Sequence, residues 1–133
     1  LANGGTRYTP HILSKVLSAD DSTLLFEKNA EIAEQIEYSE ENLDAILSGM
    51  LSVTADGTAS HVFEEYPVSV LGKSGSAQVA DGTANAIVVL AAPAQAPRIA
   101  IAVVIEHGAT GNNAALVARD ILDAYFPDKN SKD

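Results

Sequence analysis

Residues 72–78 read Gly72-Lys73-Ser74-Gly75-Ser76-Ala77-Gln78, and this segment constrains fold and function more than any other part of the chain. An apolar run that is typical of a strand precedes it, and Lys73 is the only Lys or Arg between Lys28 and Arg98. Side chains alternate between the two faces of a strand, so the hydroxyls of Ser74 and Ser76 share one face. A lone cation with hydroxyls at this spacing can hold an anionic ligand against a sheet edge. The alternative interpretation is a solvated lysine on an ordinary surface strand.

The composition excludes several classes of protein. The chain has 133 residues, enough for one domain with a real core, and a formal net charge of −10. This charge argues against nucleic acid or an anionic membrane surface as a partner. Cysteine is absent, which excludes a disulfide framework and thiol chemistry. The chain opens on Leu1 without an initiating Met, so we expect a piece of a longer protein.

The first third of the chain carries weak structural signals. Residues 1–10 are expected to form a loop that is closed by Pro10. Short β-like runs at 12–17 and 23–26 flank a polar stretch and predict a hairpin. Residues 27–41 are rich in Glu, which indicates a solvated linker that leads into a helix.

A helix is predicted over residues 40–54. Ser39 is a plausible N-cap, and acidic residues follow it in the first turn, where they favour a helix start. The apolar residues at helical spacing are Leu43, Ile46, Leu47, Met50 and Leu51. Residues 58–65 are ambiguous and could form a short helix that ends before Pro67.

The rest of the chain predicts a sheet and a last helix. Strands are expected at 68–78, 84–92 and 99–105, and the last two are apolar on both faces and joined by a connection short enough to make them antiparallel. Asn112 or Asn113 is expected to cap the last helix, and residues 128–133 are expected to be a disordered polar tail. The apolar face of that helix is predicted to comprise Val117, Ala118, Ile121, Leu122 and Tyr125. The predicted fold class is α+β, an antiparallel sheet of about three long strands plus an N-terminal hairpin, packed with helices.

Several segments, in the same order along the chain, resemble the transpeptidase domain of penicillin-binding proteins. These segments are Ala2-Asn3-Gly4-Gly5 with Pro10, Gly49-Met50 with Val53 and Gly57-Thr58-Ala59, Gly72–Gln78, Ala91-Ala92-Pro93, Val104-Ile105-Glu106-His107-Gly108 with Gly111, and Ala118–Phe126. The wording around Val104–Gly108 is most similar to the class B, elongation-type members. The resemblance implies that residues 1–127 form the C-terminal portion of a transpeptidase domain, with a partial penicillin-binding or serine β-lactamase-like fold.

Two motifs that such enzymes carry are absent from this sequence. Neither the S-x-x-K pattern of the nucleophilic serine nor an S-x-N pattern occurs anywhere in the chain. The resemblance implies that both lie before Leu1, and that this chain alone is inactive. Smaller departures are Ser74 and Ser76 where Thr is usual, Asn85 where His is usual, and Leu116 where Pro is common.

The resemblance assigns roles to the residues of the 72–78 segment. Lys73 and the hydroxyls of Ser74 and Ser76 are expected to bind the terminal carboxylate of a substrate, and the backbone N–H of Ser76 to donate to the oxyanion. Gly75 is expected to let the substrate backbone approach and pair with the strand. Gln78 is a candidate for lining the cleft. Thr58 either lines the cleft as well or serves only to end its helix.

Neither a metal nor a cofactor is expected. His11, His61 and His107 lie far apart and match no metal-ligand spacing. A Walker A phosphate loop is excluded, because the position five residues before Gly72 is Pro67 and the segment that follows is β-like.

The function predicted from these features is that of part of a peptidoglycan D,D-transpeptidase, a serine acyltransferase that β-lactams acylate. Its partners would be D-Ala-D-Ala stem peptides, β-lactams and the remainder of the transpeptidase domain. The parent protein would be extracytoplasmic, anchored in the membrane by an N-terminal segment, and the isolated chain is expected to form a homodimer through an uncovered sheet face. The alternatives are a non-catalytic binding module derived from this fold, and a fragment of a serine β-lactamase or β-lactam sensor.

Overall fold

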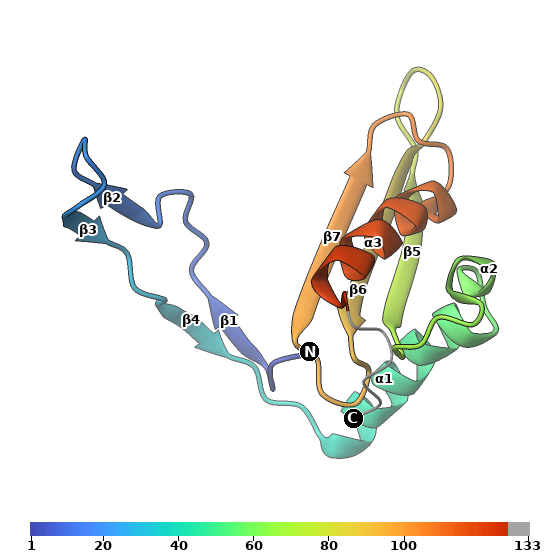
Figure 1. Cartoon of the computed structure of the whole chain (residues 1–133). Coiled ribbons are helices and arrows are strands. Elements are labelled where there is room, and N and C mark those ends of the chain that lie inside the picture. The colour runs from blue at the N-terminus through green and yellow to red at the C-terminus, as the bar shows by residue number, and fades with distance from the viewer. Residues whose placement is uncertain (128–133) are drawn as a thin grey trace. The chain divides into compact units, whose positions relative to one another are not determined.

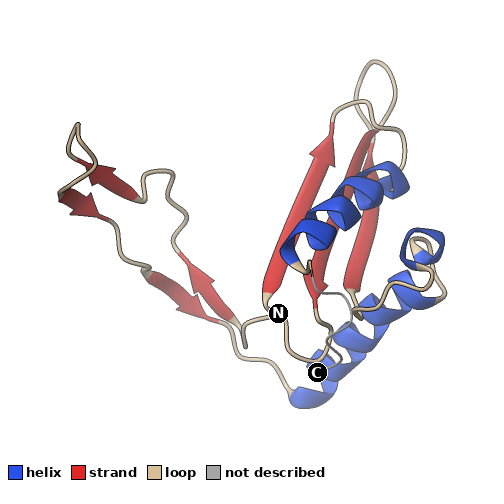
Figure 2. Cartoon of the chain, viewed as in Figure 1, coloured by secondary structure: helices blue, strands red, loops and turns tan. Residues whose placement is uncertain are grey.

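The computed structural model describes residues 1–127, so the predicted disordered tail at 128–133 lies outside the described residues. The chain divides into two compact units, an N-terminal unit at Asn3–Ser39 and a C-terminal unit that begins at Glu40. Figure 1 labels the elements of both units, and Figure 2 colours them by secondary structure. None of the described helices is long and apolar enough to cross a membrane.

The N-terminal unit consists of two short antiparallel strand pairs. Strand β2 (Lys15–Leu17) pairs with β3 (Leu24–Glu27), which confirms the predicted hairpin. Strand β1 (Thr6–Tyr8) pairs with β4 (Ile32–Gln35), so the predictions of a loop at 1–10 and of a linker at 27–41 were wrong at these positions. The two strands are far apart in the sequence and largely polar, and the Arg7–Glu34 ion pair joins them at 3.1 Å. Because both strands are largely polar, the sequence shows no apolar alternation from which this pairing could be predicted.

The C-terminal unit is built on a three-stranded antiparallel sheet, as predicted. Its strands are β5 (Leu71–Ala77), β6 (Asn85–Ala92) and β7 (Ile99–Ile105), in the order β5-β6-β7. In the register, Gly75 of β5 pairs with Ile87 of β6, and Ile87 pairs with Val104 of β7. Strand β5 is therefore an outer strand.

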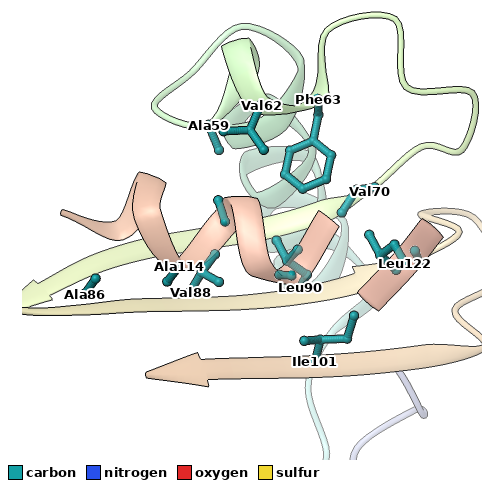
Figure 3. Packing of buried hydrophobic residues seen from close by; sticks show 13 residues of the cluster. Ala59, Val62, Phe63, Val70, Ala86, Val88, Leu90, Ile101, Ala114 and Leu122 are labelled. Carbon is teal, nitrogen blue, oxygen red and sulfur yellow. The ribbon is translucent and has the colours of Figure 1, made fainter. Parts of the chain in front are cut away.

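Helix α3 (Gly111–Tyr125) covers one face of this sheet, where Figure 3 shows the core. Alternate residues of β6 point toward the helix, and the largest of them, Val88 and Leu90, are buried with Leu122 of α3. Burial of each such side chain contributes about 1.5–3 kcal/mol. The helix packs closely because its other buried residues are small: Gly111, Ala114, Ala115 and Ala118.

Two predictions about α3 were wrong. The helix begins at Gly111 with Thr110 as N-cap, and the Asn113 side chain instead donates to the Gly108 carbonyl at 2.7 Å. Of the predicted apolar face, Ala118 and Leu122 are buried, whereas the remaining members are about two-fifths exposed: Val117, Ile121 and Tyr125. The small residues decide which side of α3 meets the sheet, because they allow the closest approach.

Helix α1 (Glu40–Ala55) confirms the predicted helix, and it packs against β5 and against the short helix α2 (Ser60–Phe63). Its one buried residue is Thr54, whose Oγ1 donates to the Val70 carbonyl at 2.5 Å. On the predicted apolar face of α1, Ile46 and Leu51 are exposed. The other three residues of that face are partly buried: Leu43, Leu47 and Met50.

The sheet face opposite α3 is apolar and partly open. Val89 of β6 is 41% exposed and Val104 of β7 is 61% exposed. The register places these two residues on the same face, together with Ala102.

Candidate functional site

The outer edge of β5 exposes backbone groups of its even-numbered residues. In an antiparallel pair, alternate residues direct both N–H and C=O toward the partner strand, and the residues between them direct theirs away. The Val70 carbonyl accepts a hydrogen bond from Thr54 of α1, and the Ser74 carbonyl accepts one from the Lys73 ammonium. Both acceptors lie at even positions, so the N–H groups of Ser74 and Ser76 share the outward direction.

The odd-numbered residue between them has the opposite orientation. A Cβ atom added to Gly111 would lie 2.9 Å from Gly75 N and 3.0 Å from Ile87 O. These two atoms belong to register partners, which is the arrangement of a pair that faces inward. The free edge therefore presents Ser74 and Ser76, and Gly75 pairs with the sheet.

Ser74 and Ser76 line a pocket at this end of the C-terminal unit. The Ser74 hydroxyl lies 2.7 Å from the Thr58 hydroxyl, so the loop after α1 is tied to the strand. The pocket has a volume of about 220 Å³. It is lined by Thr58, Ser74, Gly75, Ser76, Thr110, Gly111 and Asn112.

Of the predicted site residues, the structure brings Thr58 together with Ser74, Gly75 and Ser76 in this pocket. Lys73 and Gln78 are exposed and do not line it. The Lys73 ammonium lies at the free edge of β5, because it donates to the outward Ser74 carbonyl. The edge thus carries one positive charge beside the pocket.

The sequence analysis missed the pocket residues from the start of α3, namely Thr110, Gly111 and Asn112. A helix N-terminus concentrates backbone N–H groups and favours anions. Gly108 and Gly111 were named only within a segment that resembles the family and were given no role in the site. The spacing of these glycines before a helix was the available signal, but the sequence does not tell which strand the helix start contacts.

The loop before α3 holds this helix start in place. His107 and Ala109 have left-handed backbone angles, with φ of 54° and 66°. The Ala109 N–H donates to the Ala84 carbonyl at 2.8 Å, and the His107 N–H donates to Asn85 Oδ1 at 3.0 Å. The beginning of α3 is therefore anchored to the beginning of β6.

A partly buried polar cluster ties α2 to α3. The Arg119 guanidinium donates to the Val62 carbonyl at 2.5 Å and lies over the Tyr66 ring. Burial, and then the hydrogen bond and the charge of Asp123, raise the pKa of the Tyr66 hydroxyl well above its ordinary value. The phenol is thus neutral at ordinary pH, and the cluster fixes the segment that follows Thr58 against α3.

Metal chemistry has no evident ligand set in the part of the chain that the structure describes. Among residues 1–127, no group of three or more His, Cys, Asp or Glu side chains is arranged to hold a metal ion.

Comparison with known proteins confirms the predicted resemblance. Residues 1–123 match the family described as the penicillin binding protein transpeptidase domain. Penicillin-binding protein 2B of Streptococcus pneumoniae is 30% identical over 143 residues, which cover 94% of this chain and 20% of that protein. The chain thus spans about a fifth of the length of this curated relative.

Solved structures of penicillin-binding proteins also resemble this chain. Penicillin-binding protein 2B from Streptococcus pneumoniae strain R6 superposes with a TM-score of 0.74 at 28% identity, covering 95% of this chain and 23% of that one. The D,D-transpeptidase domain of a peptidoglycan glycosyltransferase from Eggerthella lenta gives a TM-score of 0.74 at 26% identity, covering 97% of this chain and 30% of that one. These matches confirm the predicted α+β fold.

Proposed function

Because the chain belongs to the penicillin-binding protein transpeptidase family, we propose that it supplies the substrate-carboxylate and oxyanion side of a peptidoglycan D,D-transpeptidase site. One observation carries the proposal. The outward edge of β5 at Ser74 and Ser76 meets Thr58 and the start of α3 in one pocket, with the Lys73 ammonium at the same edge. This edge is rich in donors and carries one positive charge beside the pocket, in a chain whose net charge is −10.

In the proposed reaction, a serine attacks the penultimate carbonyl of a D-Ala-D-Ala stem peptide, or the strained amide of a β-lactam. Lys73 and the hydroxyls of Ser74 and Ser76 bind the substrate carboxylate, which a charge-assisted hydrogen bond holds strongly. The outward N–H of Ser76 donates to the oxyanion as negative charge develops there. Gln78 is proposed only as an outer contact, because it is exposed and does not line the pocket.

The nucleophilic serine would come from outside this sequence. The chain contains no S-x-x-K and no S-x-N pattern. We propose that residues 1–127 are the C-terminal portion of a transpeptidase domain, and that the remainder of the domain supplies both motifs. The whole protein would act on the extracytoplasmic side of a membrane that anchors its N-terminal part.

A fluorescent penicillin tests this division of the site. The 133-residue chain is expected to remain unlabelled after denaturing electrophoresis, because donors without a nucleophile form no acyl-enzyme. The whole protein is expected to give a covalently labelled band. A labelled band from the chain alone would contradict the proposed division, and an unlabelled whole protein would contradict the proposed function.

A non-catalytic binding module derived from this fold is the second candidate, and it differs from the first in that neither serine motif would be present upstream of this sequence. Reading the parent gene upstream of Leu1 separates the two candidates. An S-x-x-K followed by an S-x-N in the upstream sequence supports the enzyme, and their absence supports the binding module. A fragment of a serine β-lactamase or β-lactam sensor is disfavoured by the relatives, which are penicillin-binding proteins.

The open sheet face has a proposed partner both in the whole protein and in the isolated chain. Val89 and Val104 expose apolar surface on the face opposite α3, and Ile46 and Leu51 of α1 are exposed as well. We propose that the remainder of the transpeptidase domain covers this surface in the whole protein, and that a second copy covers it when the chain is isolated.

Sedimentation equilibrium over a range of concentrations tests the association of the isolated chain. A dimer is expected, and Val104→Asp is expected to weaken it, because a charge on the buried face costs desolvation. A strictly monomeric folded chain at high concentration would contradict this part of the proposal.

A further inference from the structure

We infer that Gly111 is a positioning residue for the β5 edge, whose lack of a side chain lets the start of α3 sit against Ser74 and Gly75. The inference rests on the proposed function, because it concerns the same pocket. It assigns to a residue outside β5 the task of setting where the Ser76 N–H points.

The contact distances at Gly111 leave no room for a methyl group. A Cβ atom at this position would lie 2.8 Å from the Ser74 Cβ, 2.9 Å from Gly75 N and 3.0 Å from Ile87 O. Two of these neighbours are backbone atoms, and the third is the first atom of a side chain, so none can rotate away. A methyl group here therefore requires the strand or the helix to move.

The backbone of Gly111 does not itself require glycine. Its φ lies outside the left-handed region, so an alanine could adopt the same conformation. Alanine is also the better helix former. Close approach to β5 is thus the physical reason for a glycine at the first position of α3.

The strand, rather than the helix, is the part that would yield. Helix α3 is fixed by the fully buried Ala114 and Ala118, by the hydrogen bond from Arg119 to the Val62 carbonyl, and by the bond from Asn113 to the Gly108 carbonyl. Strand β5 is an outer strand and pairs with β6 on one side only. A methyl group at Gly111 is therefore expected to displace Ser74–Ser76 and to break the 2.7 Å contact between Thr58 and Ser74.

Two other glycines provide controls. A Cβ at Gly5, in the N-terminal unit, would lie 2.2 Å from the Ile36 carbonyl oxygen and 3.2 Å from the Tyr38 hydroxyl oxygen. The crowding is at least as severe as at Gly111, but it falls on residues that do not line the pocket. A Cβ at Gly49 of α1 would meet nothing within 4 Å.

The test compares acylation of the whole protein by a fluorescent penicillin in Gly111→Ala, Gly5→Ala and Gly49→Ala. Thermal melts first establish the folded fraction of each variant, and acylation rate constants are then expressed per folded molecule. Gly111→Ala is expected to acylate on the order of 10- to 100-fold more slowly, since a displacement of about 1 Å can cost 10²-fold. Gly5→Ala is expected to lose thermal stability, because its φ of 86° and the nearby Ile36 carbonyl both oppose a methyl group, while its rate constant stays within about twofold of wild type. Gly49→Ala is expected to keep the wild-type rate constant and to melt at the wild-type temperature or slightly above it, because alanine is the better helix former.

Two results would overturn the inference: a rate constant for Gly111→Ala within about twofold of wild type, or an equal loss of rate in Gly5→Ala. If the wild-type whole protein is not acylated, the proposed function fails, and amide NMR spectra of the 133-residue chain decide the positioning question alone. The Gly75 and Ser76 signals are then expected to shift in Gly111→Ala and to stay in place in Gly5→Ala. Unchanged signals in Gly111→Ala would overturn the inference.

Discussion

The two units of this chain are held together by different forces. Within the described residues, every fully buried apolar side chain lies in the C-terminal unit, from Ala59 to Leu122. The N-terminal unit instead exposes large apolar side chains, such as Leu25 at 63%. It is held by the backbone hydrogen bonds between its strands and by polar contacts such as the Arg7–Glu34 ion pair. An exposed ion pair contributes only about 0–1 kcal/mol to the stability of the folded state. A buried apolar core therefore holds the C-terminal unit together, and the candidate site lies in that unit. Hydrogen bonds hold the N-terminal unit together.

The largest expected difference between the units comes from truncating a leucine in each. Leu122→Ala removes a fully buried side chain from the core between α3 and the sheet, so it is expected to lower the free energy of unfolding by about 2–5 kcal/mol. Leu25→Ala removes a side chain that is already exposed, so it is expected to change that energy by less than about 0.5 kcal/mol. Urea unfolding followed by circular dichroism measures both. Equal losses for the two variants would break the comparison.

The smallest expected effect is a pH dependence of the stability of the β2–β3 turn in the N-terminal unit. Hydrogen bonds from the Ser18 hydroxyl, and then from Ser22, lower the pKa of Asp20 from 3.8 to about 2. Because the folded pKa is below the unfolded value, the stabilisation is present above about pH 4 and is lost as the pH falls toward 2. The carboxyl chemical shift of Asp20 and amide exchange at Ser22 measure it.

Protection of the Ser22 amide is expected to fall at low pH while protection in β6 is unchanged. An Asp20 carboxyl that titrates near 3.8 would show that the turn bonds contribute nothing.

The same contrast explains how much the sequence could predict. Strands β5–β7 and helices α1 and α3 carry long apolar runs or helical periodicity, and all five were predicted. The pairing of Thr6 with Gln35 joins distant, polar segments, so it left no local signal. The buried side of α3 was mispredicted, because Val117 and Ile121 are more apolar than the alanines that actually meet the sheet.

For the site, the family resemblance pointed to Lys73–Ser76 and Thr58, and the structure brings Thr58 together with Ser74–Ser76 in one pocket. The resemblance gave no role to Gly111, whose proposed role depends on a tertiary approach of less than about 4 Å between α3 and β5. Periodicity and motif arguments do not reveal a glycine that acts through such close approach, since glycine has no side chain with a chemical function.

Acylation of the whole protein in two lysine variants tests the central claim most directly. Lys73 lies at the free edge of β5, whereas Lys28 belongs to the N-terminal unit and pairs with Glu31 at 3.1 Å. Lys73→Ala is expected to slow acylation by a β-lactam on the order of 10²-fold, because a charged partner of the ligand carboxylate is lost, and Lys28→Ala is expected to leave it unchanged. A Lys73→Ala rate constant within about twofold of wild type, with the fold intact, would contradict the assignment of the β5 edge as the substrate-carboxylate site.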